Sequence, residues 1–156
     1  YILLTHGHID HIGALGEVRD KTNAKIAIHK EDSEMLLSGK MNLSVFMGQE
    51  LTQPKADILL KGDEKLEIGN ISMEIIHTPG HTPGGICIKI SDMIFTGDTL
   101  FAGSIGRTDF PGGSYEEIIN SITNKLLPLG DDLIIYPGHG EKSTLGKEKL
   151  SNPFLQ

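Results

Sequence analysis

The chain has 156 residues, an apolar share of 38%, a charged share of 22% and a formal net charge of −7. These values are ordinary for a single soluble domain with its own core, and the acidic balance disfavours nucleic acid as a partner, because neutralising phosphates requires a basic surface. No segment approaches the roughly 20 apolar residues of a membrane span, so we expect no membrane partner. The single cysteine, Cys87, excludes an internal disulfide and fits a reducing compartment, so we expect a cytoplasmic protein.

The first eleven residues combine a short apolar run with four potential metal ligands. Ile2 to Leu4 predict a buried strand, and the ligands that follow it at once are His6, His8, Asp10 and His11. Imidazole and carboxylate together suit zinc and iron. Such side chains are poor packing material, because each polar edge needs a partner once it is buried. The pattern therefore indicates a metal-binding loop at the end of a strand.

Between this loop and residue 57 the sequence predicts short elements. They are a helix over 12–23, a strand over 25–29 and a helix over 31–37. Leu15 and Val18 share one face of the first helix, and we expect His29 at the surface or beside the site. The stretch 39–57 has no clean period yet carries several large apolar residues, which is typical of a flap or an active-site wall.

Residues 66–96 predict a run of short strands joined by tight turns. The strands cover 66–68, 71–77, 86–90 and 93–96. Gly69-Asn70 and Ser91-Asp92 separate neighbouring strands, which favours antiparallel hairpins. His77 ends one strand, and we expect it to make a hydrogen bond or a packing contact rather than to bind metal. Cys87 is expected to be a small buried apolar residue.

The clearest helix begins at Ser114, which forms a capping box with Glu117. Apolar residues then recur at helical spacing: Ile118, Ile119, Ile122 and Leu126. Leu127-Pro128 is expected to end this helix. A strand over 132–136 and a short helix over 144–150 complete the predicted elements.

Three further ligand candidates follow predicted strands in glycine-rich turns. His81 lies in T-P-G-H-T-P-G-G, Asp98 in F-T-G-D-T and His139 in Y-P-G-H-G. In each case a strand ends, a glycine gives the backbone freedom to turn, and the ligand follows at once. Strand ends are rigid places for such side chains, so we expect the three to converge on the ligands of the first loop.

The H-x-H-x-D-H motif at 6–11, followed in order by His81, Asp98 and His139, resembles the metallo-β-lactamase superfamily over nearly the whole chain. The resemblance implies an α+β fold: an αβ/βα four-layer sandwich of two face-to-face sheets with helices outside. It also implies a dinuclear metal site at one edge of the sandwich.

The resemblance also assigns the ligands. One metal would be held by His6, His8 and His81, the other by Asp10, His11 and His139, with Asp98 bridging both. Two divalent ions about 3.5–4 Å apart repel each other, so a bridging carboxylate and hydroxide must screen them. Zinc is the expected metal, and iron and manganese suit the same ligands.

Further motifs resemble one branch of the superfamily, the short glyoxalase II-like hydrolases. They are G-R-T-D-F-P-G-G at 106–113, Y-P-G-H-G at 136–140 and T-L-G-K-E-K at 144–149. This resemblance implies hydrolysis of a small thioester by a metal-bridging hydroxide, with Asp10 as a catalytic residue that orients it. The β-lactamase branch is disfavoured, because its ligand pattern differs late in the chain.

Two alternatives stay open. Persulfide dioxygenases share G-R-T-D-F and use a single iron bound by almost the same residues, and a domain that binds metal without turnover is the second alternative. Arg107 is expected either to anchor a substrate carboxylate with its planar guanidinium or to clamp Asp109 within the loop.

The ends of the chain differ from the family pattern. Members of the family begin with several strands before the H-x-H-x-D-H segment, whereas here nothing precedes Tyr1. We therefore expect one domain, 1–156, that lacks its N-terminal strands and has no C-terminal helical domain for glutathione. An unpaired apolar strand invites association, so we expect either a homodimer that covers this edge or a chain whose upstream part was lost.

Overall fold

The computed structural model describes all residues from 1 to 156, and it contains two main sheets. The smaller sheet has the order β1-β2-β3, and both of its pairings are parallel. Its strands are β1 (Ile2–Leu3), β2 (Ile26–His29) and β3 (Ile58–Leu60). The β3 strand was not predicted, because three residues that pair with a parallel neighbour leave no hairpin signal.

The larger sheet has six strands in the order β11-β10-β7-β6-β5-β4. Its strands are β4 (Lys65–Ile68), β5 (Ile71–His77), β6 (Ile86–Ile90), β7 (Met93–Gly97), β10 (Ile134–Pro137) and β11 (Ser143–Thr144). The β4–β5 and β6–β7 pairs are antiparallel, which confirms the two predicted hairpins. By contrast, β10 runs parallel to β7, so both strands end at the same edge of the sheet. A separate ribbon pairs β8 (Leu100–Phe101) with β9 (Ser104–Ile105).

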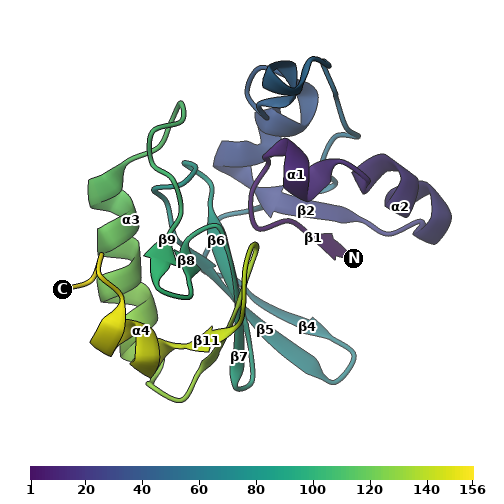
Figure 1. Cartoon of the computed structure of the whole chain (residues 1–156). Helices are drawn as coiled ribbons and strands as arrows, with labels where there is room; N and C mark the ends of the chain where they lie inside the picture. Colours follow the sequence, from purple (N-terminus) through teal and green to yellow (C-terminus); the bar gives the residue numbers. More distant parts are fainter.

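Three apolar clusters separate four layers, as the resemblance implied. The cluster between the sheets joins Ala27 and Leu60 of the small sheet to Met73, Ile75 and Ile86 of the large one. The outer face of the small sheet packs on helices α1 (Ile9–Ile12) and α2 (Leu15–Thr22). The outer face of the large sheet packs on α3 (Tyr115–Ser121) and α4 (Leu145–Ser151), so helices lie outside both sheets (Figure 1).

The predicted helix from Ser114 forms, although its end differs from the prediction. The Ser114 hydroxyl accepts a hydrogen bond from the Glu117 amide at the start of α3. A π-helical segment, η3 (Ile122–Leu126), and a 3₁₀ turn, η4 (Leu127–Leu129), then extend the helix. Pro128 therefore lies inside the final turn rather than beyond it, which is tolerated because proline fits the first turn of a new helical segment.

The terminal helix α4 carries a buried carboxylate that ties it to the rest of the domain. Glu148 is fully buried and accepts hydrogen bonds from the Gly103 amide at 2.7 Å, the Asn152 side chain at 2.9 Å and the Ser143 hydroxyl. These partners satisfy a charge that burial would otherwise make costly.

The first thirty residues differ from the expectations in two details. The helix expected over 12–23 forms as α2, which begins three residues later and ends one residue earlier, and Val18 is exposed while Leu15 is buried. His29 is buried, which excludes the surface from its two expected positions, because β2 is the central strand of its sheet and all four of its residues are covered. Two 3₁₀ helices follow, η1 (Lys30–Leu37) where a helix was predicted and η2 (Ser44–Met47) within the irregular stretch.

The β1 strand lies at the edge of its sheet and pairs with β2 alone. The dimer expected to cover this edge stays a prediction. None of the helices has the length and apolar character needed to cross a bilayer.

Candidate metal centre

The small sheet delivers four of the predicted ligands through the connection that follows β1. His6 and His8 lie in the loop, and Asp10 and His11 lie in α1, where the carboxylate takes the favourable position in the first turn of a helix. The loop residues are buried, whereas the side chains of Asp10 and His11 are 49% and 15% exposed. One short segment therefore presents ligands at two depths.

The large sheet delivers the other three ligands from the ends of its strands. His81 follows β5, Asp98 follows β7 and His139 follows β10. The glycines predicted to allow these turns act in two ways. Gly97 has a positive φ of 49°, whereas Gly138 matters for space, since a Cβ there would lie 2.4 Å from Asp98 Oδ1.

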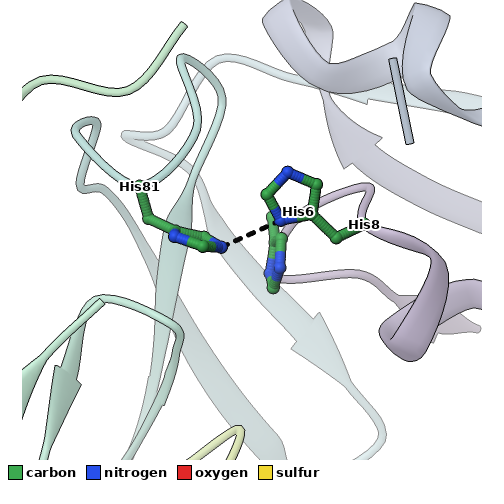
Figure 2. A group of neighbouring side chains, drawn as sticks. All are labelled: His6, His8 and His81. Atoms are coloured by element: carbon green, nitrogen blue, oxygen red, sulfur yellow. Dashed lines mark hydrogen bonds between the residues drawn. The ribbon is translucent and has the colours of Figure 1, made fainter. Parts of the chain in front are cut away.

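Three histidines form a buried group. His6, His8 and His81 are 2%, 5% and 5% exposed, and their imidazoles turn toward one another from the two loops (Figure 2). His8 Nδ1 lies 2.9 Å from His81 Nε2, close to the roughly 3.3 Å between two nitrogens that share a tetrahedral ion. His6 Nε2 is buried with no hydrogen-bond partner. A buried nitrogen without a hydrogen-bond partner indicates a site where a bound group, such as a metal ion, would supply the missing interaction.

A second group faces the solvent. His139 Nε2 lies 3.0 Å from Asp10 Oδ2 and 3.3 Å from His11 Nε2. The His139 side chain is 56% exposed, whereas that of His11 is 15% exposed. The ligand atoms of these three residues all lie within 4.8 Å of one another, as do those of the buried group.

Asp98 lies between the two groups. Its Oδ1 is 3.3 Å from His11 Nε2, and its Oδ2 is 3.7 Å from His81 Nε2 and 3.6 Å from His139 Nε2. Burial would raise the pKa of Asp98, but neighbouring His11, with His81 and His139, brings that pKa below its ordinary value. Asp98 is therefore an anionic ligand candidate that reaches both groups.

The protonation states of His6 and His8 favour metal binding. Burial, reinforced by the neighbouring imidazole of His81, lowers the pKa of His8 to about 4, and burial lowers the pKa of His6 well below its ordinary value. Both rings are therefore neutral at pH 7. His81 Nδ1 donates to the Arg107 carbonyl at 2.8 Å, which leaves the lone pair of Nε2 directed at the site. Neutral imidazoles, a carboxylate and two buried atoms without a hydrogen-bond partner, His6 Nε2 and Asp98 Oδ1, together fit a divalent metal.

Sequence reasoning missed Asp32, which supports the buried group from behind. Asp32 is fully buried; its Oδ2 accepts from the Thr82 hydroxyl at 2.7 Å and its Oδ1 from the Gly84 amide at 2.6 Å. Burial raises its pKa, and these hydrogen bonds, with one from the Gly7 amide, oppose that rise. The carboxylate thus joins the His81 loop to the loop between His6 and His8.

The other candidates lie around the centre. Arg107 clamps Asp109 through two hydrogen bonds of 2.9 and 2.7 Å, as one of its two interpretations held, and its role as a substrate anchor stays a prediction. His77 Nε2 donates to the Pro83 carbonyl at 2.8 Å, which confirms its expected hydrogen-bonding role. Its ring stacks on buried His29 at 4.1 Å. Cys87 is fully buried, as expected, and burial raises the pKa of its thiol to about 11.

Comparisons with known proteins agree with this geometry. Probable metallo-hydrolase YqgX of Bacillus subtilis is 43% identical over 99% of this chain and 74% of its own length. Hydroxyacylglutathione hydrolase GloC of Haemophilus influenzae is 42% identical, with the same two coverages.

Solved structures of similar proteins carry several names. The crystal structure of BLEG-1 B3 metallo-beta-lactamase superposes with a TM-score of 0.95 at 41% identity, over 99% of this chain and 76% of that one. TTHA1623, solved in a di-iron-bound form, gives 0.83 at 31% identity over 99% and 76%. The first of these names belongs to the branch that the ligand pattern disfavoured.

The family is shown by a match along most of the chain. Residues 1–139 match the Metallo-beta-lactamase superfamily, a range that includes all seven candidate ligands. Members of this superfamily bind divalent metals, and the His and Asp groups described above are able to do so. The chain therefore belongs to the metallo-beta-lactamase superfamily of metal-dependent hydrolases.

Proposed function

We propose that the protein hydrolyses small thioesters at a site for two divalent ions, most simply zinc. In this proposal His6, His8 and His81 would hold one ion, Asp10, His11 and His139 would hold the other, and Asp98 would serve both. The observation that carries the proposal is the position of Asp98, whose two oxygens face both ligand groups. The 42% identity to a hydroxyacylglutathione hydrolase supports the thioester as substrate.

The residues of the chain divide the work of the reaction. Bound divalent ions lower the pKa of a coordinated water and polarise a substrate carbonyl. Asp10, which is partly exposed at the cleft, would hold an ion through the oxygen that faces His139, and its other oxygen would orient the attacking water and accept its proton. The water oxygen adds to the thioester carbonyl carbon, the C–S bond breaks, and the thiol leaves with a proton. The Arg107 carbonyl keeps His81 in the required tautomer throughout.

Hydrolysis of S-lactoylglutathione by zinc-loaded protein tests this function. We expect steady-state release of the free thiol, together with about two bound zinc ions per chain by elemental analysis. Complete metal loading without turnover of any thioester would falsify the proposal and leave a metal-binding domain.

An iron-dependent persulfide dioxygenase is the second candidate. The G-R-T-D-F motif at 106–110 resembles that enzyme class, which uses a single iron. Oxygen uptake with glutathione persulfide by iron-loaded protein, without thioester hydrolysis, would favour it. A parallel assay with a chromogenic cephalosporin tests the activity that the BLEG-1 name suggests.

A further inference from the structure

The cleft above the candidate metal centre has mainly apolar walls. It encloses about 550 Å³ and is lined on one side by the metal-ligand candidates His8, Asp10, His81, Asp98 and His139. The remaining wall is mostly apolar: Ile9, Leu43, Phe46, Met47, Phe101, Ile105 and Phe110. A substrate that reaches the ligands must therefore contact hydrocarbon on its way in.

The cleft offers little to a negatively charged substrate. Arg107 is its sole Lys or Arg residue, and two hydrogen bonds already engage that guanidinium with Asp109. The guanidinium also lies over the Phe110 ring, 4.2 Å from its centre. Apart from the metal ions that Asp10, Asp98 and the histidines would hold, the lining thus has no free cation to pair with a carrier that bears several carboxylates.

Leu43, Phe46 and Met47, called here the apolar wall, stand on a rigid base. Asn42 is fully buried, and its amide group donates to the Met35 and Leu51 carbonyls at 3.0 and 2.8 Å. The Asn42 carbonyl in turn accepts from the Ile9 amide at 2.9 Å, next to Asp10. The base is therefore tied directly to the helix that carries two ligand candidates.

Two side chains of the apolar wall are largely exposed to solvent. Phe46 is 79% exposed and Met47 is 71% exposed, although both line the cleft. Leu43 holds a positive φ of 70°, a conformation that costs free energy for a branched residue. Exposed apolar side chains on a fixed, strained turn are typical of a ligand-binding surface.

We propose that the cleft takes thioesters with an uncharged thiol carrier and an apolar acyl chain, and that this chain packs on Phe46 and Met47. This inference rests on the proposed thioester hydrolysis and specifies its substrate class. It places anionic glutathione thioesters among the poorer substrates of this protein.

A chain-length series of neutral substrates tests the inference. The probes are acetyl, butanoyl and hexanoyl thioesters of N-acetylcysteamine, compared with S-lactoylglutathione on the zinc-loaded protein. We expect kcat/KM to rise about twofold to fourfold per added methylene, and the hexanoyl ester to exceed S-lactoylglutathione. A flat series, or a preference for S-lactoylglutathione, overturns the inference while leaving thioester hydrolysis intact.

Matched variants locate the preference. Phe46→Ala and Met47→Ala should raise KM for the hexanoyl ester about fivefold or more with little change in kcat, and should flatten the series. Val45→Ala is the control, because Val45 lies in the same turn but does not line the cleft. An equal effect of all three variants would show that the turn merely folds less well.

A binding measurement tests the apolar preference of the cleft independently of thioester hydrolysis. Metal-free protein is titrated calorimetrically with the acetyl and hexanoyl esters, which it should bind without turnover. Tighter binding of the hexanoyl ester that is lost in Phe46→Ala supports the apolar cleft even if no thioester is hydrolysed. Equal binding of the two esters contradicts it.

Discussion

The two halves of the candidate metal centre differ in their exposure to solvent. The buried half, His6, His8 and His81, is at most 5% exposed, whereas in the open half the side chains of Asp10 and His139 are 49% and 56% exposed. The buried half is also supported from outside, by Asp32 and by the Arg107 carbonyl. In the open half Asp10 and His139 depend chiefly on each other and on His11.

This difference suggests a division of labour. A buried, neutral and preformed set of ligands holds an ion with little reorganisation, because its side chains are already fixed. An exposed set leaves room for substrate and water, at the cost of weaker positioning. We therefore expect the buried half to determine metal retention and the open half to determine turnover.

Loss of a buried ligand should have the largest effect. His8→Ala removes a ligand from the buried half and should lower kcat/KM more than 100-fold, since changes to residues that merely support a ligand already cost about 10–100-fold. Bound metal should fall with it, as elemental analysis will measure. Near-normal activity in this variant would mean that the site is assigned wrongly.

Loss of an open ligand should separate metal content from activity. His139→Ala is expected to keep about one ion per chain while losing most of its turnover, because the buried half is untouched. Titration with zinc under chelator competition distinguishes the two occupancies. If both ions are lost together, the two halves are one cooperative site and the division fails.

Asp32→Asn tests the support behind the buried half. The new amide group cannot accept from both Thr82 and Gly84, so we expect metal affinity to fall about 10–100-fold and stability to fall by about 1–3 kcal/mol. Chelator competition and urea unfolding measure the two quantities.

Glu148→Gln is the matched control for this change. Glu148 is equally buried and accepts from a hydroxyl and an amide, but its partners lie in segments without metal ligands. The control should lose similar stability and keep its metal affinity. Equal losses of affinity in the two variants would reduce Asp32 to a purely structural role.

A smaller effect of pH is expected from His77, whose ring holds the Pro83 carbonyl behind the buried half. Burial, with neighbouring His29, lowers the pKa of His77 below the ordinary value of 6.5. Below about pH 6.5 the unfolded chain therefore binds a proton that the folded chain refuses, and stability is lost as pH falls. His77→Gln keeps a hydrogen-bond donor but removes the titrating imidazole. The variant should be less stable than the native protein at pH 7, and this difference in the free energy of unfolding should shrink as the pH falls from 7 to 5. Urea unfolding at both values checks this, and a constant deficit would contradict it.

The sequence was sufficient to locate the ligand candidates, because each is a polar residue placed directly after an apolar strand. The structure brings all seven into overlapping groups of neighbouring ligand atoms, even though His6 and His139 are far apart in the chain. Asp32 could not be found in this way. It lies in an acidic stretch that suits any helix start, and its partner Thr82 is 50 positions away with no spacing rule to connect them.

The surface position expected for His29 failed for a physical reason. The alternation in K-I-A-I-H predicts a strand, but the parallel neighbours β1 and β3 make β2 a central strand that is covered on both faces. Burial of His29 thus depends on which strands lie beside it, and the local pattern does not contain that information.

The cluster between the sheets carries a consequence for the chemistry. Four of the ligand candidates hang from one sheet and three from the other, so the spacing between them is a property of how the two layers are stacked. Residues such as Ile75 and Ile86, which lie between the sheets and outside the cleft, set the distance and register between the two layers. A substitution there that lets one layer shift over the other would change the distances between the ligand candidates without altering any of them.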